Sequence, residues 1–461
     1  MLSTSGAQRR ERGDMKNVAR EHGFRPLRVE GRIPSELDGT LVRTGPGLYD
    51  RFGTRVQHSF EANGALSAVR LLAGRAEGAI RLCRGAGMLA EERAGRPLFS
   101  GVGIASRIAN GLRGRTKNTG NTALLAWQDR LFALVESSRP LEISPHDLST
   151  IGETDLDGAI TSAFSAHPHR VVSRRASYNF GLAYGRKSEI VLYELPWEGR
   201  ARRLCSVPLR VPVMLHDFAV GARYAVFFVS PVRIDIARAL LGARSFGDIV
   251  RWEPKRGVEV IVVPLDAPER VSRFTVPAFY QWHFAGVHER GHELVVRYVR
   301  YADFTTFGQL ASSGATERGQ LHEAVIDPIA HTLRSEAIWG EASEFPVLDP
   351  RFEGGAAHAL FILCADEERH AIARLDLTTR RARVVTLGEN EKGSEPIFVP
   401  RNETAPECDG WVLSLVYDGE RDTSHLAIFD TARFEDGPVA RCHFETHVPM
   451  TFHGVWLPRA R

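Results

Sequence analysis

Four histidines are the residues of this chain whose type and setting could do chemistry. His167, His216, His283 and His453 lie in the short contexts AHP, MLHDF, QWHFAG and VPMTFHG. They are too far apart in the sequence to share one helix or hairpin, so only a fold that joins distant segments can bring them together. Imidazoles that meet in this way form a metal site, and imidazole suits iron, zinc, copper and nickel. The function therefore depends on whether the four side chains converge.

Short apolar runs of strand length dominate the chain from about residue 38 to its end. They are rich in Val, Ile, Leu and Phe and are bounded by Gly, Pro, Asp or Asn, which predicts β-strands. Clear examples are SEIVLYELPWEG (188–199), YAVFFVSPV (224–232), VEVIVVPLD (258–266) and GWVLSLVYDGE (410–420), and LDLTTRRARVV (375–385) predicts a hairpin.

No long helical segment and no Pro/Ser-rich linker interrupts this pattern. The fold class is therefore all-β. Seven four-stranded sheets of roughly 60 residues each, arranged radially as a β-propeller, would use this length. The chain lacks the fixed-period repeat of a WD40 or kelch array. Short helices and loops are expected to form a cap over one face.

Composition narrows the class of protein. The chain has 461 residues, 43% of them hydrophobic, with 59 basic and 56 acidic side chains, which describes a globular protein. The balanced charge argues against nucleic acid as the main partner. The five cysteines are scattered and form no C-x-x-C, so a reducing cytoplasm is expected. We expect a disordered lead-in over 1–25, a single domain over 26–461, and no membrane-spanning helix.

Ordered motifs from about residue 30 to 460 resemble the carotenoid cleavage oxygenase family, which includes retinal-pigment isomerohydrolases and bacterial apocarotenoid and stilbene oxygenases. The matching segments are LDGTLVRTGPGLYD (37–50), HSFEANGALSAVRL (58–71), KNTGNTALL (117–125), LFALVESSRPLEISPHDLSTIGETDL (131–156), SAHPHR (165–170), MLHDFAV (214–220), EFPVLDPR (344–351), SEPIFVPR (394–401), ECDGWVLSLVYD (407–418) and VPMTFHGVW (448–456).

The resemblance implies a seven-bladed β-propeller with Fe(II) on its axis and with the four histidines as its ligands. It also implies that Glu136, Glu344 and Glu395 accept the far N–H of ligand imidazoles, which would fix the ring orientation. Coordination positions would stay free for O2. The reaction implied is cleavage of a C=C bond of a carotenoid or apocarotenoid into two carbonyl products. No catalytic side chain is expected beyond the iron ligands.

An apolar polyene substrate would need an apolar tunnel. The aromatic residues that flank the ligands, Trp282, Phe284, Phe218 and Phe452, are candidates to line it. Because adjacent strand residues point to opposite faces, only some of them can do so.

Two other functions remain open. Cleavage of a stilbene or phenylpropanoid double bond is the first, but relatives of that kind typically carry a Lys before the first of the three glutamates and a Tyr upstream. Here Val135 stands before Glu136, and residues 101–103 read GVG. The second is a non-catalytic propeller that serves as a binding module, whose mark would be a broken set of histidines.

Two segments combine helical apolar spacing with arginines. Residues 100–115 and 233–246 are either short helices at a sheet edge or elements that touch a lipid surface. We therefore expect a cytoplasmic protein with possible peripheral membrane contact through these segments.

Overall fold

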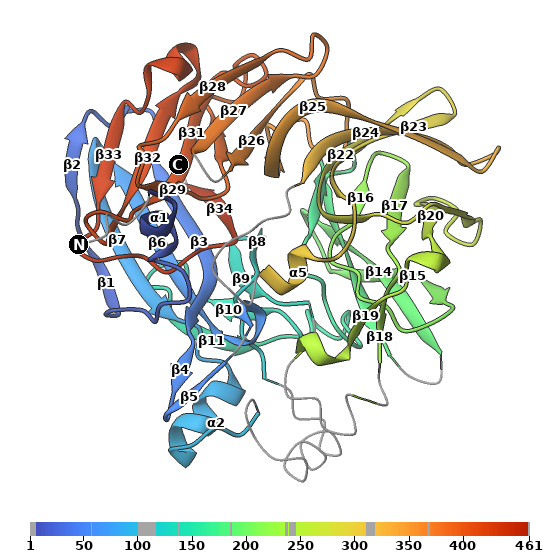
Figure 1. Cartoon of the computed structure of the whole chain (residues 1–461), viewed down its shortest axis with the longest axis horizontal. Coiled ribbons are helices and arrows are strands. Elements are labelled where there is room, and N and C mark those ends of the chain that lie inside the picture. Colours follow the sequence, from blue (N-terminus) through green and yellow to red (C-terminus); the bar gives the residue numbers. More distant parts are fainter. Residues whose placement is uncertain are drawn as a thin grey trace.

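Antiparallel strands make up most of the chain. The computed structural model describes residues 6–56, 58–99, 117–136, 138–184, 187–235, 238, 246–309, 319–366 and 369–459. Within these ranges strands greatly outnumber short helices, which confirms the all-β prediction (Figure 1).

Four sheets come from the first part of the chain and its last strand. In hydrogen-bonded order they are β1 (His22–Pro26), β7 (Arg75–Leu82), β6 (Asn63–Leu72), β3 (Gly39–Leu48) and β34 (His453–Pro458); β11 (Thr150–Glu153), β10 (Leu141–Ile143), β9 (Arg130–Leu134) and β8 (Ala123–Trp127); β12 (His169–Val171), β13 (Ala176–Ala183), β14 (Ser188–Pro196) and β15 (Arg202–Leu209); and β16 (Ala219–Val220), β17 (Tyr224–Val229), β20 (Val258–Pro264) and β21 (Ser272–Val276).

Two larger sheets follow. One has the order β22 (Tyr280–Arg290), β23 (Glu293–Tyr301), β24 (Gln320–Asp327), β25 (Thr332–Val347), β26 (Ala359–Ala365), β27 (His370–Asp376) and β28 (Ala382–Thr386). The other has the order β2 (Arg28–Gly31), β33 (Ala440–His443), β32 (Thr423–Asp430), β31 (Gly410–Asp418) and β29 (Glu391–Gly393), with β30 (Ile397–Pro400) also paired to β31. The long strand β25 pairs with β24 near its beginning and with β26 near its end, so two four-stranded units share it. The predicted hairpin is β27–β28.

Small elements connect these sheets. They are the pairs β4 (Asp50–Arg51) with β5 (Thr54–Arg55) and β18 (Val232–Ile234) with β19 (Val250–Trp252), the helices α1 (Gly6–Glu11), α2 (Ala86–Ala94) and α5 (Thr306–Gln309), and the 3-10 turns Ser59–Glu61, Val172–Arg174, Phe246–Ile249, Pro254–Arg256 and Thr431–Asp436.

The hydrophobic cores lie between neighbouring sheets. Strand β17 reads YAVFFV and β20 reads VEVIVVP, and both bury nearly every side chain. The side chains on one face of these strands pack against β13 and β14, and the side chains on the other face pack against β23 and β24. A central strand therefore needs apolar residues on both faces, which explains why its sequence is a continuous apolar run.

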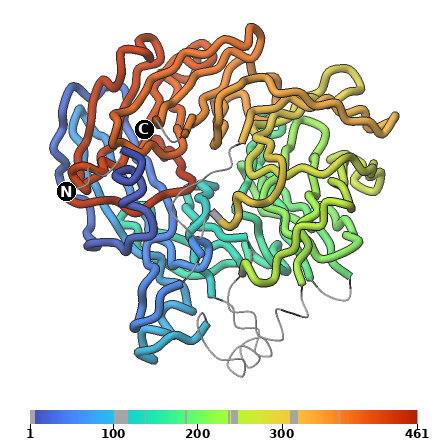
Figure 2. Tube along the Cα trace, viewed as in Figure 1, coloured from blue at the N-terminus to red at the C-terminus, as the bar shows by residue number. Residues whose placement is uncertain are grey.

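The chain passes around the molecule in sequence order and returns to its start. Figure 2 shows blue segments beside red ones, with green and orange segments on the way around. Pairing joins the two ends: β34 lies beside β3, with Thr44 opposite His453, and β2 lies beside β33. The last histidine is thereby held by a strand from the N-terminal part of the chain.

The N-terminal segment contains regular elements within the range of the expected lead-in. Residues 6–11 form α1, and β1 begins at His22, within the range 1–25. The segment is held by ion pairs of Asp14 with Lys392 and of Lys16 with Asp422. Charge complementarity with Lys392 of β29 and with Asp422, both distant in the chain, holds it in place, and local composition does not reveal such contacts.

The structure describes only part of the two segments for which the sequence showed helical spacing. Residues 100–115 lie outside the described residues, and of 233–246 only 233–235, 238 and 246 are described. Arg233 and Ile234 belong to strand β18 rather than to a helix. Among the described residues, no helix has the length and apolar character needed to cross a membrane.

Candidate functional site

The four histidines come from four different sheets and meet at one place. His167 lies just before β12 and His216 just before β16, whereas His283 is in β22 and His453 begins β34. The ring centroid of His167 is 4.2 Å from that of His216, 5.2 Å from that of His283 and 4.8 Å from that of His453. The His283 centroid is 5.3 Å from His216 and 4.8 Å from His453. The structure thus brings the four rings together.

The nitrogens of this cluster can hold a metal ion. One ligand atom from each of His167, His216 and His283 lies within 4.8 Å of the others. Nε2 of His167 and Nε2 of His283 are buried and have no hydrogen-bond partner among the described residues. Burial, together with the other three imidazoles, lowers the pKa of His167 well below its usual value, so this ring is neutral and offers a lone pair. Buried, unpaired imidazole nitrogens are the donor atoms that a transition metal requires.

Three glutamates each contact the Nδ1 atom of one imidazole, on the side of the ring away from the centre of the cluster. Nδ1 of His283 donates to Glu344 Oε2 at 2.6 Å, and Nδ1 of His453 donates to Glu395 Oε1 at 2.8 Å. Nδ1 of His216 lies 2.8 Å from Glu136 Oε1. A ring that gives its Nδ1 proton to a carboxylate turns its Nε2 lone pair the other way, toward the centre of the cluster.

These carboxylates are ionised. Burial raises the pKa of each one, but the hydrogen bond and the charge of its histidine outweigh burial, so the pKa of Glu136, of Glu344 and of Glu395 lies below the usual value. Burial lowers the pKa of His283, yet the Glu344 carboxylate raises it more, and the net shift is upward. The cluster is therefore surrounded by negative charge.

Glu344 is held by Tyr301 of β23 and by its own strand neighbour Phe345 as well as by His283. The Tyr301 hydroxyl donates to Glu344 Oε1 at 2.7 Å, and the Phe345 N–H donates to Oε2 at 2.8 Å. Strand β25 is irregular from Glu344 to Val347, and Phe345 has a φ of 56°, in the left-handed region that non-glycine residues rarely adopt. This backbone conformation places the Phe345 ring against the His283 and His453 rings, with centroids 4.9 Å and 5.3 Å away.

Arg43 is a buried cation to which sequence reasoning gave no role. Its side chain, in β3, is 1% exposed. It donates to Thr451 Oγ1 at 2.8 Å, to the Phe452 carbonyl at 3.0 Å and to the Glu395 carbonyl at 3.0 Å. Its Nη1 is 3.5 Å from Glu395 Oε2. Arg43 thus joins the segment before His453 to the glutamate that holds His453. The sequence offered one sign of this role, because a charged arginine stands inside the strand-like segment LVRTG, where burial would require a partner.

Asp217 ties two of the histidine-bearing segments together. Its carboxylate accepts a hydrogen bond of 2.8 Å from the backbone N–H of Phe284, the residue that follows His283 in the chain. It also accepts one of 2.7 Å from the backbone N–H of Phe218, the residue that follows Asp217. The His169 Nε2 lies 2.7 Å from the same side chain. One carboxylate therefore fixes the backbone beside His216 against the backbone beside His283.

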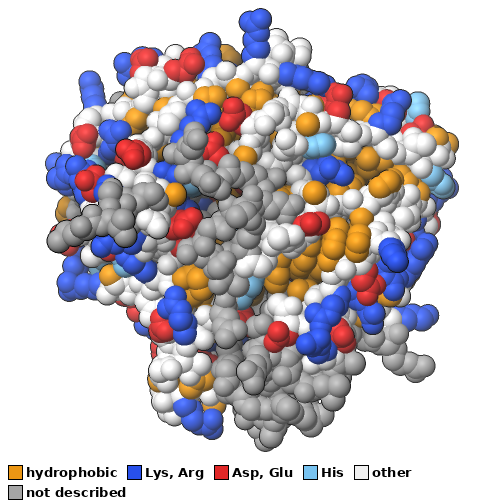
Figure 3. Space-filling model, viewed as in Figure 1, with side chains coloured by type: hydrophobic (Ala, Val, Ile, Leu, Met, Phe, Trp, Pro, Cys, Tyr) orange, Lys and Arg blue, Asp and Glu red, His pale blue; other side chains and the backbone are white. Residues whose placement is uncertain are grey.

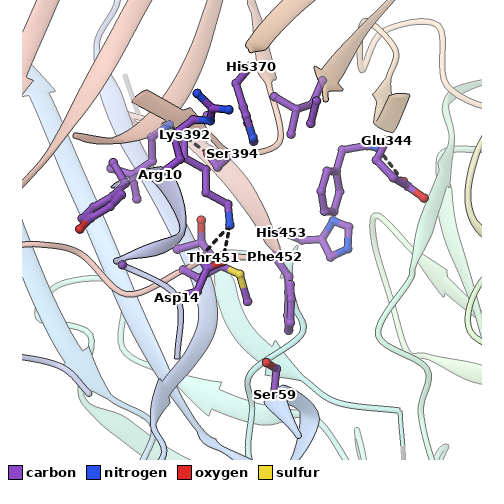
Figure 4. A pocket seen from close by; sticks show the side chains of 18 of the residues that line it. Arg10, Asp14, Ser59, Glu344, His370, Lys392, Ser394, Thr451, Phe452 and His453 are labelled. Carbon is purple, nitrogen blue, oxygen red and sulfur yellow. Dashed lines mark hydrogen bonds and ion pairs between the residues drawn. The ribbon is translucent and has the colours of Figure 1, made fainter. Parts of the chain in front are cut away.

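A cavity of about 370 Å³ opens from the histidine cluster. The predicted tunnel residues Trp282 and Phe452 line it, together with His216, His283 and His453. Figure 4 shows Phe452 and His453 side by side on its wall. Phe60 also lines the cavity and contacts the rings of His216, Trp282 and Phe452. Sequence reasoning did not single out Phe60, although it lies in the motif HSFEANG.

The other two predicted tunnel residues lie in the hydrophobic core instead. Phe218 stacks on Phe227, and Phe284 packs against Phe228 and Tyr298. In a regular strand, Trp282 and Phe284 would share a face, and His283 would point the other way. Strand β22 departs from regular pairing between Gln281 and Phe284, so that Trp282 and His283 both reach the cavity while Phe284 does not.

Comparison with known proteins gives consistent results. The family model described as retinal pigment epithelial membrane protein matches residues 15–458. The apocarotenoid-15,15'-oxygenase of Synechocystis sp. is 30% identical, covering 93% of this chain and 92% of that protein. The resveratrol cleavage oxygenase 1 of Aspergillus fumigatus is 26% identical, covering 96% and 94%. The crystal structure of cobalt-substituted Synechocystis apocarotenoid oxygenase has a TM-score of 0.89 and 28% identity, covering 98% of this chain and 99% of that one.

The role given to Arg43 predicts a large loss of stability on Arg43→Met. Removing the guanidinium leaves Glu395 and two carbonyls without their buried donor, and breaking a buried ion pair in this way costs about 3–5 kcal/mol. Urea unfolding followed by circular dichroism measures the change. Arg75→Met, at an exposed position of β7 in the same sheet, is the matched control, and we expect it to change stability by less than about 0.5 kcal/mol. Equal effects of the two substitutions would contradict the role of Arg43.

Proposed function

Because the chain belongs to the carotenoid cleavage oxygenase family, whose model is described as retinal pigment epithelial membrane protein, we propose that it is an Fe(II)-dependent oxygenase. The proposed reaction cleaves one C=C bond of a carotenoid or apocarotenoid with O2 and gives two carbonyl products. The observation that carries the proposal is the convergence of the four imidazoles beside an apolar, aromatic cavity.

The proposed fold that places the imidazoles is a seven-bladed β-propeller. Seven four-stranded units can be traced if β25 is shared between two of them and if β34 completes the unit of β3, β6 and β7. The pairing of the C-terminal strand with an N-terminal one supports closure of a ring, because it joins the first unit to the end of the chain. The remaining short helices and loops would then cover one face.

His167, His216, His283 and His453 would hold the iron. Four neutral imidazoles bring no charge, whereas Glu136, Glu344 and Glu395 bring three negative charges and Arg43 brings one positive charge. The two negative charges that remain are those a divalent cation balances in a buried site. Fe(II), when bound, supplies the activation of O2.

The side chains of the protein bind, orient and shield the substrate. Phe60, Trp282 and Phe452 give the cavity an aromatic wall on which a conjugated polyene can pack. Their faces also favour positive charge that develops on the polyene. The three glutamates keep the imidazoles in fixed orientations. Cleavage by this route requires no acid, base or nucleophile from the chain, so none of these residues needs to exchange a proton.

Removal of any one of the four imidazoles is expected to abolish iron binding and turnover. The variants are His167→Ala, His216→Ala, His283→Ala and His453→Ala, each compared with His425→Ala, which removes a buried histidine of β32. Iron content after reconstitution and product formation from an apocarotenal are the two measurements. A variant that keeps full iron content and full activity would remove its residue from the ligand set.

Cleavage of a stilbene is the second candidate function, favoured by the similarity to the resveratrol cleavage oxygenase 1 of Aspergillus fumigatus. Against it, the residue before Glu136 is Val135, a buried apolar side chain that cannot pair with a phenolate.

Paired assays of the iron-loaded protein separate these two functions. We expect turnover of an apocarotenal to exceed that of a hydroxystilbene by at least roughly tenfold, because the missing donor for a phenol costs about one hydrogen bond to a charged group. Faster cleavage of the hydroxystilbene would favour the second function. A lack of turnover on both substrates, with iron bound, would favour a non-catalytic binding module.

Peripheral membrane contact through residues 100–115 and 233–246 is also a proposal. The support for it is in the sequence, where both segments combine apolar residues at helical spacing with arginines. Figure 3 shows hydrophobic side chains gathered to the right of the centre of one face, with charged side chains around them, but residues 100–115 are not among them, because they lie outside the described residues. We expect the protein to co-sediment with anionic liposomes at low salt and to be released at high salt. If the protein stays in the supernatant at low salt, there is no such contact.

A further inference from the structure

His167 is held differently from the other three histidines of the cluster. Each of the other three rings lies beside a glutamate, whereas among the described residues no carboxylate contacts the ring of His167. Its Nε2 is nevertheless buried without a hydrogen-bond partner among those residues, and its ring lies within the cluster. A ring without such a contact depends on its backbone for its position. The groups that hold the backbone of His167 are therefore part of the site.

Ser165 ties the backbone of His167 to the backbone of His216. Its hydroxyl accepts the N–H of His167 at 3.1 Å and donates to the carbonyl of His216 at 3.4 Å. Ser165 is 2% exposed, and the side chain of Asn179 in β13 donates to its carbonyl at 2.7 Å. The segments before β12 and before β16 are thus joined at the residues that carry the two imidazoles.

His169 makes the second tie of the His167 segment. Its Nε2 lies 2.7 Å from Asp217 Oδ1, and because a carboxylate only accepts, this nitrogen donates the hydrogen bond. Pro168 stands between the two histidines. Proline fixes its own φ and restricts the backbone of the residue before it, so the position of His169 constrains the position of His167.

Asp217 extends this tie to the segment of His283. Its Oδ2 accepts the N–H of Phe284 at 2.8 Å, in the irregular stretch of β22, and its Oδ1 also accepts the N–H of Phe218. Asp217 is 1% exposed. The three hydrogen bonds of one buried carboxylate therefore come from the segments of His167, His216 and His283. These are the same three histidines whose ligand atoms lie within 4.8 Å of one another.

We propose that Asp217 and His169 are positioning residues of the metal centre, and that their hydrogen bond holds His167 in place relative to His216 and His283. The pair does for His167, through the backbone, what the glutamates do for the other rings. This proposal rests on the proposed function, because it concerns the same metal centre. The carboxylate is essential to it: an amide at position 217 would turn an NH2 group toward one of the three donors.

The test measures metal binding in the absence of substrate. The full-length protein is freed of metal by chelation and titrated with Co(II), whose visible absorption depends on the number and arrangement of its ligands. Co(II) has also been substituted into the apocarotenoid oxygenase of Synechocystis. The wild-type protein is expected to bind Co(II) and to give one reference spectrum.

Two variants of His169 isolate the hydrogen bond. His169→Phe keeps a ring against Phe218, whose centroid is 5.3 Å from that of His169, but it removes the donor to Asp217. We expect it to lower the affinity for Co(II) by roughly tenfold to hundredfold, the usual effect of losing a hydrogen bond that orients metal ligands, and to change the absorption spectrum. His169→Gln keeps an N–H donor at a similar reach and is expected to restore most of both.

Asp217→Asn is expected to lose at least as much affinity as His169→Phe, because it disturbs three hydrogen bonds. If Asp217→Asn does not fold, the two variants of His169, whose side chain is 24% exposed, decide the test. His443→Phe is the matched control. It removes a histidine of β33 that lies 3.2 Å from Glu30 and does not line the cavity, so we expect affinity and spectrum to stay unchanged.

Thermal unfolding of each variant separates positioning from general stability. If His169→Phe unfolds at a lower temperature but binds Co(II) with unchanged affinity and spectrum, the hydrogen bond only stabilises the fold and the proposal is wrong. Equal losses in His169→Phe and His169→Gln would also overturn it, because the donor would then not be what matters.

Product formation keeps this proposal apart from the oxygenase function. If the Co(II) results are as expected but the iron-loaded wild-type protein cleaves no apocarotenal, the oxygenase function fails and the positioning role stands. If the wild-type protein cleaves the apocarotenal and all variants bind Co(II) equally, only the positioning role fails. A wild-type protein that binds no Co(II) would overturn both.

Discussion

The constraint on which the structure depends is that four imidazoles from four sheets must turn their lone pairs toward one point. None of these rings is close to another in the chain, so each position is set by the packing of a whole sheet against its neighbours. The sheets alone place the backbone, but a histidine ring can still rotate. The carboxylates of Glu136, Glu344 and Glu395 remove that freedom for three rings, because each holds the outward Nδ1.

Holding the rings with carboxylates has an electrostatic cost, and this cost explains why hydrogen-bond donors and a cation lie beside the glutamates. Three ionised carboxylates beside a buried cluster repel one another and are costly to take out of water. Tyr301 and the Phe345 N–H donate to Glu344, and Arg43 lies beside Glu395. A divalent cation at the centre would offset the remaining charge. The proposed metal would then form one charge-balanced unit with the glutamates and Arg43, and a change to any of these side chains would alter the affinity for the metal.

The sequence predicted the convergence of distant residues better than the direction of nearby ones. The motifs around His167, His216, His283 and His453, and those around the three glutamates, indicated one centre because the resemblance covers the whole chain. Phe284 was a candidate for the tunnel because it flanks His283 in the sequence, but strand β22 is irregular there, and Phe284 packs in the core while Trp282 and His283 line the cavity. Arg43 and the N-terminal segment act through partners more than 350 residues away in the chain, and no local pattern reports such contacts.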